Sequence, residues 1–183
     1  ARDQVNVQHY GAGGDGVTDD TAAVQAALAA CPDGGTVYFP PSTVARVRAT
    51  YYVPSGITIG GPPRRSISLV GGEQRSTIRA AAGASVIKIV PTAEIGLNAR
   101  HTIRSLVLVG GRIGLELIGA GDGDKFSDIR IENPSEAGLY IGPENGSWTS
   151  REVRDMLIFG GQYGIRVVGD KRVNNTTWRN IYI

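Results

Sequence analysis

Phe126-Ser127-Asp128-Ile129-Arg130-Ile131 is a hexapeptide whose profile (apolar, any, small polar, apolar, any, apolar) occurs four times in the second half of the chain. The other copies begin at Ile103, Val153 and Trp178. The repeat is therefore about 25 residues long, and a second apolar alternation recurs within its units at Gly114, Gly138 and Gly164. Period-two alternation inside a repeat of this length predicts a rung of a parallel β-solenoid.

Rungs of this kind must stack, because a single rung cannot bury its own inward side chains. We expect two apolar columns, made of Leu106, Ile129, Met156 and Ile181 and of Leu108, Ile131, Ile158 and Ile183. The small polar position of the profile predicts a ladder at one corner, made of Ser105, Asp128, Asp155 and Asn180. Aspartate and asparagine commonly form turns, so we interpret this ladder as structural; calcium binding or catalysis is the alternative.

The first sixty residues have a different pattern. Val5–Val7 predicts a strand, the glycine run Gly11–Gly16 a turn or loop, and the alanine-rich segment a helix over about 19–30, capped by Asp19 or Thr18. A strand is expected at Thr36–Phe39. A further strand pair is expected at Tyr51–Val53 and Ile57–Ile59.

Gly11, Gly13 and Gly16 also form the pattern G-x-G-x-x-G between a strand and a helix, which is the arrangement found in dinucleotide-binding proteins. Asp15 stands where a pyrophosphate would lie, and further acidic residues place negative charge at the helix N-terminus, where an anion would bind. We therefore do not expect dinucleotide binding.

Gly11-Ala12, the run Gly14–Ala27 (GDGVTDDTAAVQAA) and Gly34–Pro40 (GGTVYFP) together resemble the opening signature of the pectate-lyase-like β-helix superfamily, which includes many phage tailspikes. The resemblance implies an all-β fold, a right-handed parallel β-helix with a short N-terminal capping α-helix. One departure is visible. The usual Pro-x-Gly-x-Tyr appears here as Pro40-Pro41-Ser42-Thr43-Val44, so we expect a reshaped turn.

The chain is long enough for one folding unit over 1–183. Within it we expect an N-terminal cap over 1–60 and rungs over 61–183. The sequence stops at Ile183 inside a strand of the repeat. Because an open apolar end would aggregate, we expect the protein to continue there or to pack against a partner.

Composition argues against several classes of function. Lys and Arg number 19 and Asp and Glu 17, a net charge of +2 that gives no footprint for nucleic acid. No apolar run reaches the roughly 18 residues of a membrane span, so no membrane insertion is expected. Cys31 is the single cysteine, and Asp122-Gly123-Asp124 is too short for a calcium loop, so we expect no metal or other cofactor.

Glycoside hydrolysis usually needs two carboxylates on one surface. The outward-facing acids and the loop acids do not pair in one column on neighbouring rungs; they are Glu116, Glu132, Glu136, Glu144, Asp122 and Asp124. Glu116 and Glu132 are the catalytic candidates. The carbohydrate-binding candidates are Tyr140, Trp148, Tyr163 and Arg166, since aromatic faces can stack on sugar rings; ordinary packing is the alternative.

The resemblance implies polysaccharide as the partner. The first hypothesis is a homotrimeric phage tailspike or tail-fibre module of the virion that binds bacterial surface polysaccharide, with cleavage by residues downstream of Ile183. The second is a secreted, monomeric polysaccharide lyase or glycoside hydrolase. The third is a structural β-helix with no active site. Fold alone does not separate the three hypotheses.

Overall fold

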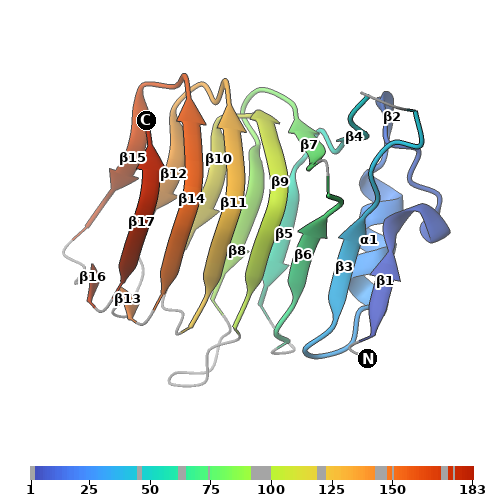
Figure 1. Cartoon of the computed structure of the whole chain (residues 1–183), viewed down its shortest axis with the longest axis horizontal. Helices are drawn as coiled ribbons and strands as arrows, with labels where there is room; N and C mark the ends of the chain where they lie inside the picture. The colour runs from blue at the N-terminus through green and yellow to red at the C-terminus, as the bar shows by residue number, and fades with distance from the viewer. Residues whose placement is uncertain are drawn as a thin grey trace.

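The computed structural model describes residues 3–44, 47–61, 65–73, 75–91, 100–118, 123–142, 151–169 and 176–183, together with the backbone of 148–149 and 173–174. These ranges are nearly all β, with one α-helix, α1 (Thr21–Ala30), and a short 3₁₀ helix, η1 (Val7–Tyr10). Figure 1 shows strands stacked side by side along the long axis of the molecule, with the two termini at opposite ends.

Two parallel sheets form the walls of this stack. Sheet A has ten strands, β1 (Gln4–Asn6), β2 (Asp15–Asp19), β3 (Thr36–Phe39), β4 (Thr50–Tyr52), β6 (Ser68–Gly71), β7 (Ser76–Ala80), β9 (Thr102–Gly110), β11 (Lys125–Glu132), β14 (Glu152–Phe159) and β17 (Thr177–Tyr182). Sheet B has five, β5 (Ile57–Gly60), β8 (Ser85–Val90), β10 (Ile113–Leu117), β12 (Ala137–Ile141) and β15 (Tyr163–Val167). A small third sheet pairs β13 (Trp148–Thr149) with β16 (Val173–Asn174). The chain passes from sheet to sheet and returns one strand further along, which confirms the predicted parallel β-helix.

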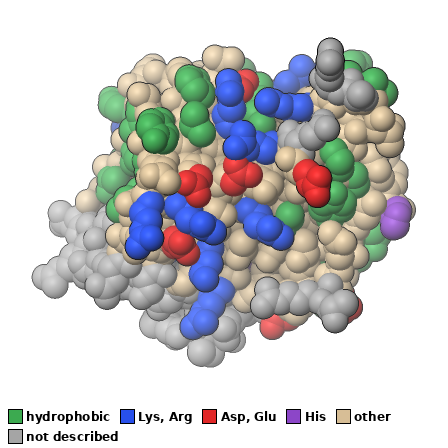
Figure 2. All heavy atoms as spheres, in the orientation of Figure 1, with side chains coloured by type: hydrophobic (Ala, Val, Ile, Leu, Met, Phe, Trp, Pro, Cys, Tyr) green, Lys and Arg blue, Asp and Glu red, His purple; other side chains and the backbone are tan. Residues whose placement is uncertain are grey.

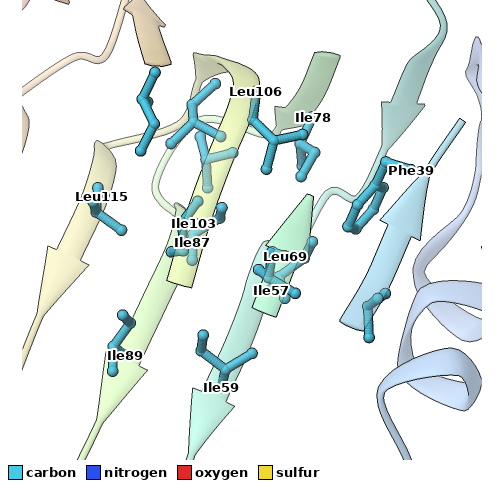
Figure 3. Packing of buried hydrophobic residues seen from close by; sticks show 14 of the residues in the cluster. Phe39, Ile57, Ile59, Leu69, Ile78, Ile87, Ile89, Ile103, Leu106 and Leu115 are labelled. Atoms are coloured by element: carbon cyan, nitrogen blue, oxygen red, sulfur yellow. The ribbon is translucent and has the colours of Figure 1, made fainter. Parts of the chain in front are cut away.

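The predicted repeat sets the register of the strands. Phe126 pairs with Ile103 on one side and with Val153 on the other, and Val153 pairs with Trp178. The first apolar column is confirmed, because Leu106, Ile129, Met156 and Ile181 occupy successive paired positions. Figure 3 shows part of this core, with apolar side chains from both sheets meeting between them.

Each long strand of sheet A turns a corner at the small polar position of the repeat. Ser105 has a φ of +57°, and the equivalent residues Asp128, Asp155 and Asn180 have φ values of +55°, +53° and +51°. This left-handed conformation is strained for most side chains but is adopted comparatively readily by Asn and Asp. Ile103 and Leu106 are consequently both buried, although strict alternation would place them on opposite faces.

The recurrent glycine of the second strand allows the two sheets to approach closely. A Cβ atom at Gly138 would lie 2.3 Å from Cγ2 of Ile158, and one at Gly114 would lie 2.4 Å from Cγ2 of Ile131. These isoleucines belong to the second predicted column. The glycines therefore leave room for the core side chains of sheet A.

The helix α1 lies at the N-terminal end of the stack, against β1 and η1 (Figure 1). Its predicted apolar residues Val24, Ala27 and Leu28 are buried. It begins at Thr21, later than predicted. The Asp20 carboxylate does not cap it but accepts the N–H groups of Gly13 at 2.7 Å and Gly14 at 3.2 Å.

Three local predictions for this region are only partly correct. The strand predicted at Val5–Val7 ends at Asn6, and η1 begins at Val7. The predicted glycine loop includes the start of β2, which pairs with β4. The segments near Tyr51 and Ile57 are both strands but do not pair, because β4 joins sheet A and β5 joins sheet B. Strands β3 to β5, all before residue 61, are already part of the two sheets.

Candidate functional site

The outer face of sheet B carries a column of polar and aromatic side chains. Successive paired positions on β5, β8, β10, β12 and β15 are Thr58, Lys88, Glu116, Tyr140 and Arg166. Neighbouring strands in a sheet lie about 4.8 Å apart, so these side chains form a continuous surface. Together with Arg112, Glu136 and Tyr163 we call Lys88, Glu116, Tyr140 and Arg166 the sheet B cluster.

Glu116 is the most buried member of this cluster, with its side chain 7% exposed. Its Oε2 accepts a 2.6 Å hydrogen bond from the Ser85 hydroxyl and lies 3.8 Å from Nζ of Lys88. Its Oε1 lies 3.6 Å from a guanidinium nitrogen of Arg112. The carboxylate is thus enclosed by a hydroxyl and two cations, an arrangement that satisfies a buried charge.

Glu136 forms ion pairs with two arginines, Arg112 from the preceding rung and Arg166 from the following rung. Arg112 donates to its Oε2 at 2.5 Å, and Arg166 forms an ion pair with its Oε1. The hydrogen bond from Arg112 holds the pKa of Glu136 below its ordinary value, and Arg166 acts in the same direction. Glu136 is therefore ionised at neutral pH and fixes the position of both guanidinium groups.

Arg166 also contacts two tyrosines. Its guanidinium carbon lies 5.0 Å from the ring centre of Tyr163 and 5.9 Å from that of Tyr140. Gly142 makes room for the Tyr140 ring, because a Cβ at this position would lie 2.8 Å from its Cε1. Tyr163 lies on β15, the last strand of sheet B in this chain, and is 46% exposed, whereas the residues at its position on the two preceding strands, Ala137 and Ile113, are buried. An exposed ring beside a fixed guanidinium can stack on an apolar ligand face while the arginine donates hydrogen bonds.

The structure brings together three of the four predicted carbohydrate-binding residues, namely Tyr140, Tyr163 and Arg166. The fourth, Trp148, lies in β13, and its side chain is outside the described residues. Of the two catalytic candidates, Glu116 is in the sheet B cluster, but Glu132 is on sheet A. There Glu132 pairs with Arg130, whose guanidinium lies over the ring of Phe159.

The other predicted acids occupy different environments. Glu144 and Asp122 lie outside the described residues. Asp124 is buried, and its Oδ2 lies 3.0 Å from a guanidinium nitrogen of Arg151. Among the residues that the structure describes, no three His, Cys, Asp or Glu side chains are grouped so that they could hold a metal ion.

The predicted ladder residues line the bend of sheet A. Asn180 donates from Nδ2 to Oδ1 of Asp155 at 2.9 Å, and Arg75 donates to Oδ1 of Asp128 at 2.5 and 2.7 Å. The left-handed backbone at these positions supports the structural interpretation.

Sequence reasoning missed Arg112, Ser85 and Lys88 and gave no partner for Glu136. A signal was present, because Arg112, Glu136 and Gln162 all stand two residues before the recurrent glycine of the second strand. Extending the repeat backwards by two residues would have placed Arg112 and Glu136 on neighbouring rungs.

Comparison with known proteins identifies the family of this β-helix. The profile of the family described as "Rhamnogalacturonase A/epimerase, pectate lyase-like" matches residues 4–183. The chain belongs to this family. The match includes the N-terminal signature and so confirms the resemblance predicted from those residues. No curated relative matches the sequence.

A solved structure resembles the pectate-lyase-like chain over almost its full length. It is described as Geobacillus virus E2 ORF18, with a TM-score of 0.65 and 23% sequence identity. The likeness covers 97% of this chain and 40% of the viral protein, so the chain spans less than half the length of that protein. At this identity the comparison shows a shared fold.

Proposed function

We propose that this pectate-lyase-like β-helix is a polysaccharide-binding module of a phage virion, and that the glycan lies across the sheet B cluster. The carrying observation is that the guanidinium of Arg166 lies beside the rings of both Tyr163 and Tyr140. The family description names a rhamnogalacturonase and a pectate lyase, which supports a glycan as the ligand. The viral origin of the similar structure supports a virion.

The chemistry of the cluster suits a sugar. The apolar C–H face of a pyranose stacks on an exposed ring such as that of Tyr163, and its hydroxyls accept hydrogen bonds from Arg166 and Arg112. Both arginines are already held by Glu136, so binding would cost little side-chain entropy. A rung spacing of about 4.8 Å lets a linear glycan contact successive strands.

The cluster favours binding over cleavage. A general acid for glycoside hydrolysis needs a raised pKa, whereas Arg112 lowers the pKa of Glu136. Glu116 is enclosed by its own partners. We therefore propose that any catalytic pair belongs to a part of the protein beyond these rungs.

The proposal is tested by affinity electrophoresis of the protein in gels that contain individual bacterial surface polysaccharides. At least one polysaccharide should retard the wild type, and Tyr163→Ala and Arg166→Gln should each weaken retardation at least tenfold. Tyr10→Ala is the matched control, since Tyr10 is an exposed tyrosine of η1. Equal retardation of all variants would rule out the sheet B cluster as the binding surface.

The virion form and the enzyme form of the hypothesis differ in assembly and in products. A homotrimer in light scattering, with no shortening of the bound polysaccharide, is expected for the virion module. A monomer that releases oligosaccharides, and loses this activity in Glu116→Gln, would support the secreted enzyme instead.

A further inference from the structure

A hollow of about 390 Å³ opens on the outer face of sheet A, over β3, β6 and β9. This wall of the β-helix is the one opposite the sheet B cluster, and Figure 2 shows basic and acidic side chains mixed over it. Tyr38, Val70, Gly71, Glu73 and Arg104 are among the residues that line the hollow. We call it the sheet A hollow.

Three successive paired positions form one side of the sheet A hollow. Tyr38 on β3 pairs with Val70 on β6, and Val70 pairs with Arg104 on β9. Because neighbouring strands lie about 4.8 Å apart, an aromatic ring, an aliphatic side chain and a guanidinium follow one another across this face. Tyr38 is partly buried, and Val70 is buried although it is not part of the core between the sheets. The hollow therefore has an apolar part beside its cation.

Glu73 and Arg104 bring opposite charges to the sheet A hollow without pairing with each other. Both side chains are exposed, and neither forms an ion pair with any residue that the structure describes. Their charged atoms are accordingly more than 4.0 Å apart, although both residues line one hollow. A single ligand can therefore reach both charges.

The residues around these two charges do not neutralise them. The residues in register with Arg104 on the neighbouring strands, Val70 and Ser127, are uncharged. Arg75, two residues after Glu73, is held by the carboxylate of Asp128 through hydrogen bonds of 2.5 and 2.7 Å. Glu73 and Arg104 are thus the anion and the cation of the sheet A hollow that remain for a ligand.

We propose that the sheet A hollow binds a free amino acid with an apolar side chain. Arg104 donates charge-assisted hydrogen bonds to the carboxylate of the ligand, and Glu73 accepts them from its ammonium group. The ring of Tyr38 and the side chain of Val70 pack against the apolar side chain. The volume of the hollow lies within the range of about 300–1,000 Å³ that is usual for small-molecule sites.

Other ligand classes fit this pair of charges less well. A carboxylate without an ammonium group is repelled by Glu73, and an amine without a carboxylate is repelled by Arg104. A neutral sugar displaces water from both charged groups and offers neither of them an opposite charge. The inference is independent of the proposed function, which concerns the sheet B cluster.

A second hollow on the same wall lacks this pair of charges. It opens at the first residues of β6, β9 and β11, and its lining includes Arg100 and Lys125 but no Asp or Glu. Lys125 is paired in register with Glu152 on β14, and Asp124 directly precedes it in the chain. The second hollow therefore offers no partner for an ammonium group, and we assign the amino acid to the sheet A hollow.

The test is isothermal titration of the protein with phenylalanine, with leucine, with hydrocinnamate, which lacks the ammonium group, and with phenethylamine, which lacks the carboxylate. Phenylalanine should bind at least tenfold more tightly than either analogue, and Arg104→Gln and Glu73→Gln should each weaken its binding at least tenfold. Arg154→Gln is the matched control, because Arg154 is an exposed arginine in the same outward column, outside the hollow. Folding of each variant is checked by circular dichroism.

The two analogues separate a binding role of the charges from a structural one. Glu73→Gln removes the repulsion of a carboxylate and should bind hydrocinnamate more tightly than the wild type does, whereas Arg104→Gln should gain affinity for phenethylamine. Tyr163→Ala should bind phenylalanine as the wild type does, whether or not it loses a polysaccharide. The inference is wrong if neither phenylalanine nor leucine binds, if both analogues bind as tightly as phenylalanine, or if Glu73→Gln and Arg104→Gln keep the wild-type affinity.

Discussion

Asn180 donates a 2.9 Å hydrogen bond to the carboxylate of Asp155 on the preceding rung, and both residues hold a left-handed backbone conformation. The two residues are at equivalent places in the repeat, where sheet A turns its corner. The side-chain ladder and the bend are therefore one feature: the residue types that tolerate a positive φ are also those that can hydrogen-bond to each other from rung to rung.

Substitutions of Asp155 separate the contribution of the left-handed backbone from that of the hydrogen bond with Asn180. Asp155→Val should lower the free energy of unfolding by about 1–2 kcal/mol, because a β-branched residue is strained at a φ of +53°. Asp155→Gly, which relieves the strain but loses the hydrogen bond, should cost less. Urea denaturation followed by circular dichroism measures both, and a glycine variant less stable than the valine variant would contradict the assigned role of the bend.

The recurrent glycine of the second strand is predicted to be a packing requirement. Gly138→Ala places a methyl group 2.3 Å from Cγ2 of Ile158, so overpacking should destabilise the protein by about 1–3 kcal/mol. Gly13→Ala is the control, since the nearest atom to its new Cβ would be 3.8 Å away. Thermal unfolding of the two variants should differ clearly; similar melting temperatures would mean that the sheets can move apart at no cost.

His101 should make the fold sensitive to acid. Burial lowers the pKa of this histidine, whose Nδ1 accepts the Ile67 N–H at 3.3 Å. The unfolded chain, with a pKa of about 6.5, then binds the proton more readily, so stability is complete above that pH and falls as the pH drops below it. Below pH 6.5, His101→Gln should flatten the pH dependence of the unfolding free energy relative to the wild type. If the unfolding free energy of His101→Gln depends on pH as that of the wild type does, His101 is not the source of the acid sensitivity.

Arg112 should control the charge of Glu136. Arg112→Gln removes the hydrogen bond that most lowers the pKa of Glu136, so this pKa should rise towards 4.5. Because the folded-state pKa is lowered, the stabilisation is present above about pH 4.5 and is lost as the pH falls through the lowered value. The pKa is read from the carboxyl carbon shift of Glu136 in an NMR titration. Lys88→Gln is the comparison. Because Lys88 pairs with Glu116, this substitution should leave the pKa of Glu136 unchanged.

The repeat was predictable because it depends on side chains that alternate within a fixed period. Ile129 and its equivalents in the repeat are all apolar because they fill one continuous column, and this regular spacing can be recognised in the sequence. The strand β8 was not predicted, because Val86 stands in place of the glycine that marks the later copies of the second strand.

The candidate site was harder to predict, because it depends on positions outside the repeat motif. Tyr140 and Arg166 were found since they lie in the marked strand, whereas Arg112 and Glu136 precede the strand and meet only through the stacking of rungs. Glu116 and Glu132 were both candidates as outward acids, but Glu132 belongs to β11 of sheet A and Glu116 to β10 of sheet B. The hollow at the first residues of β6, β9 and β11 was not predicted, because Ser66, Arg100 and Gly123 precede these strands at unequal spacings in the sequence.

The central claim, that the outer face of sheet B binds polysaccharide, is tested most directly by a crystal structure of the protein with the oligosaccharide repeat of a polysaccharide that retards it. The account predicts a sugar ring stacked on Tyr163, with its hydroxyls within hydrogen-bond distance of Arg166 or Arg112. An oligosaccharide bound elsewhere, with the sheet B cluster free, would contradict it.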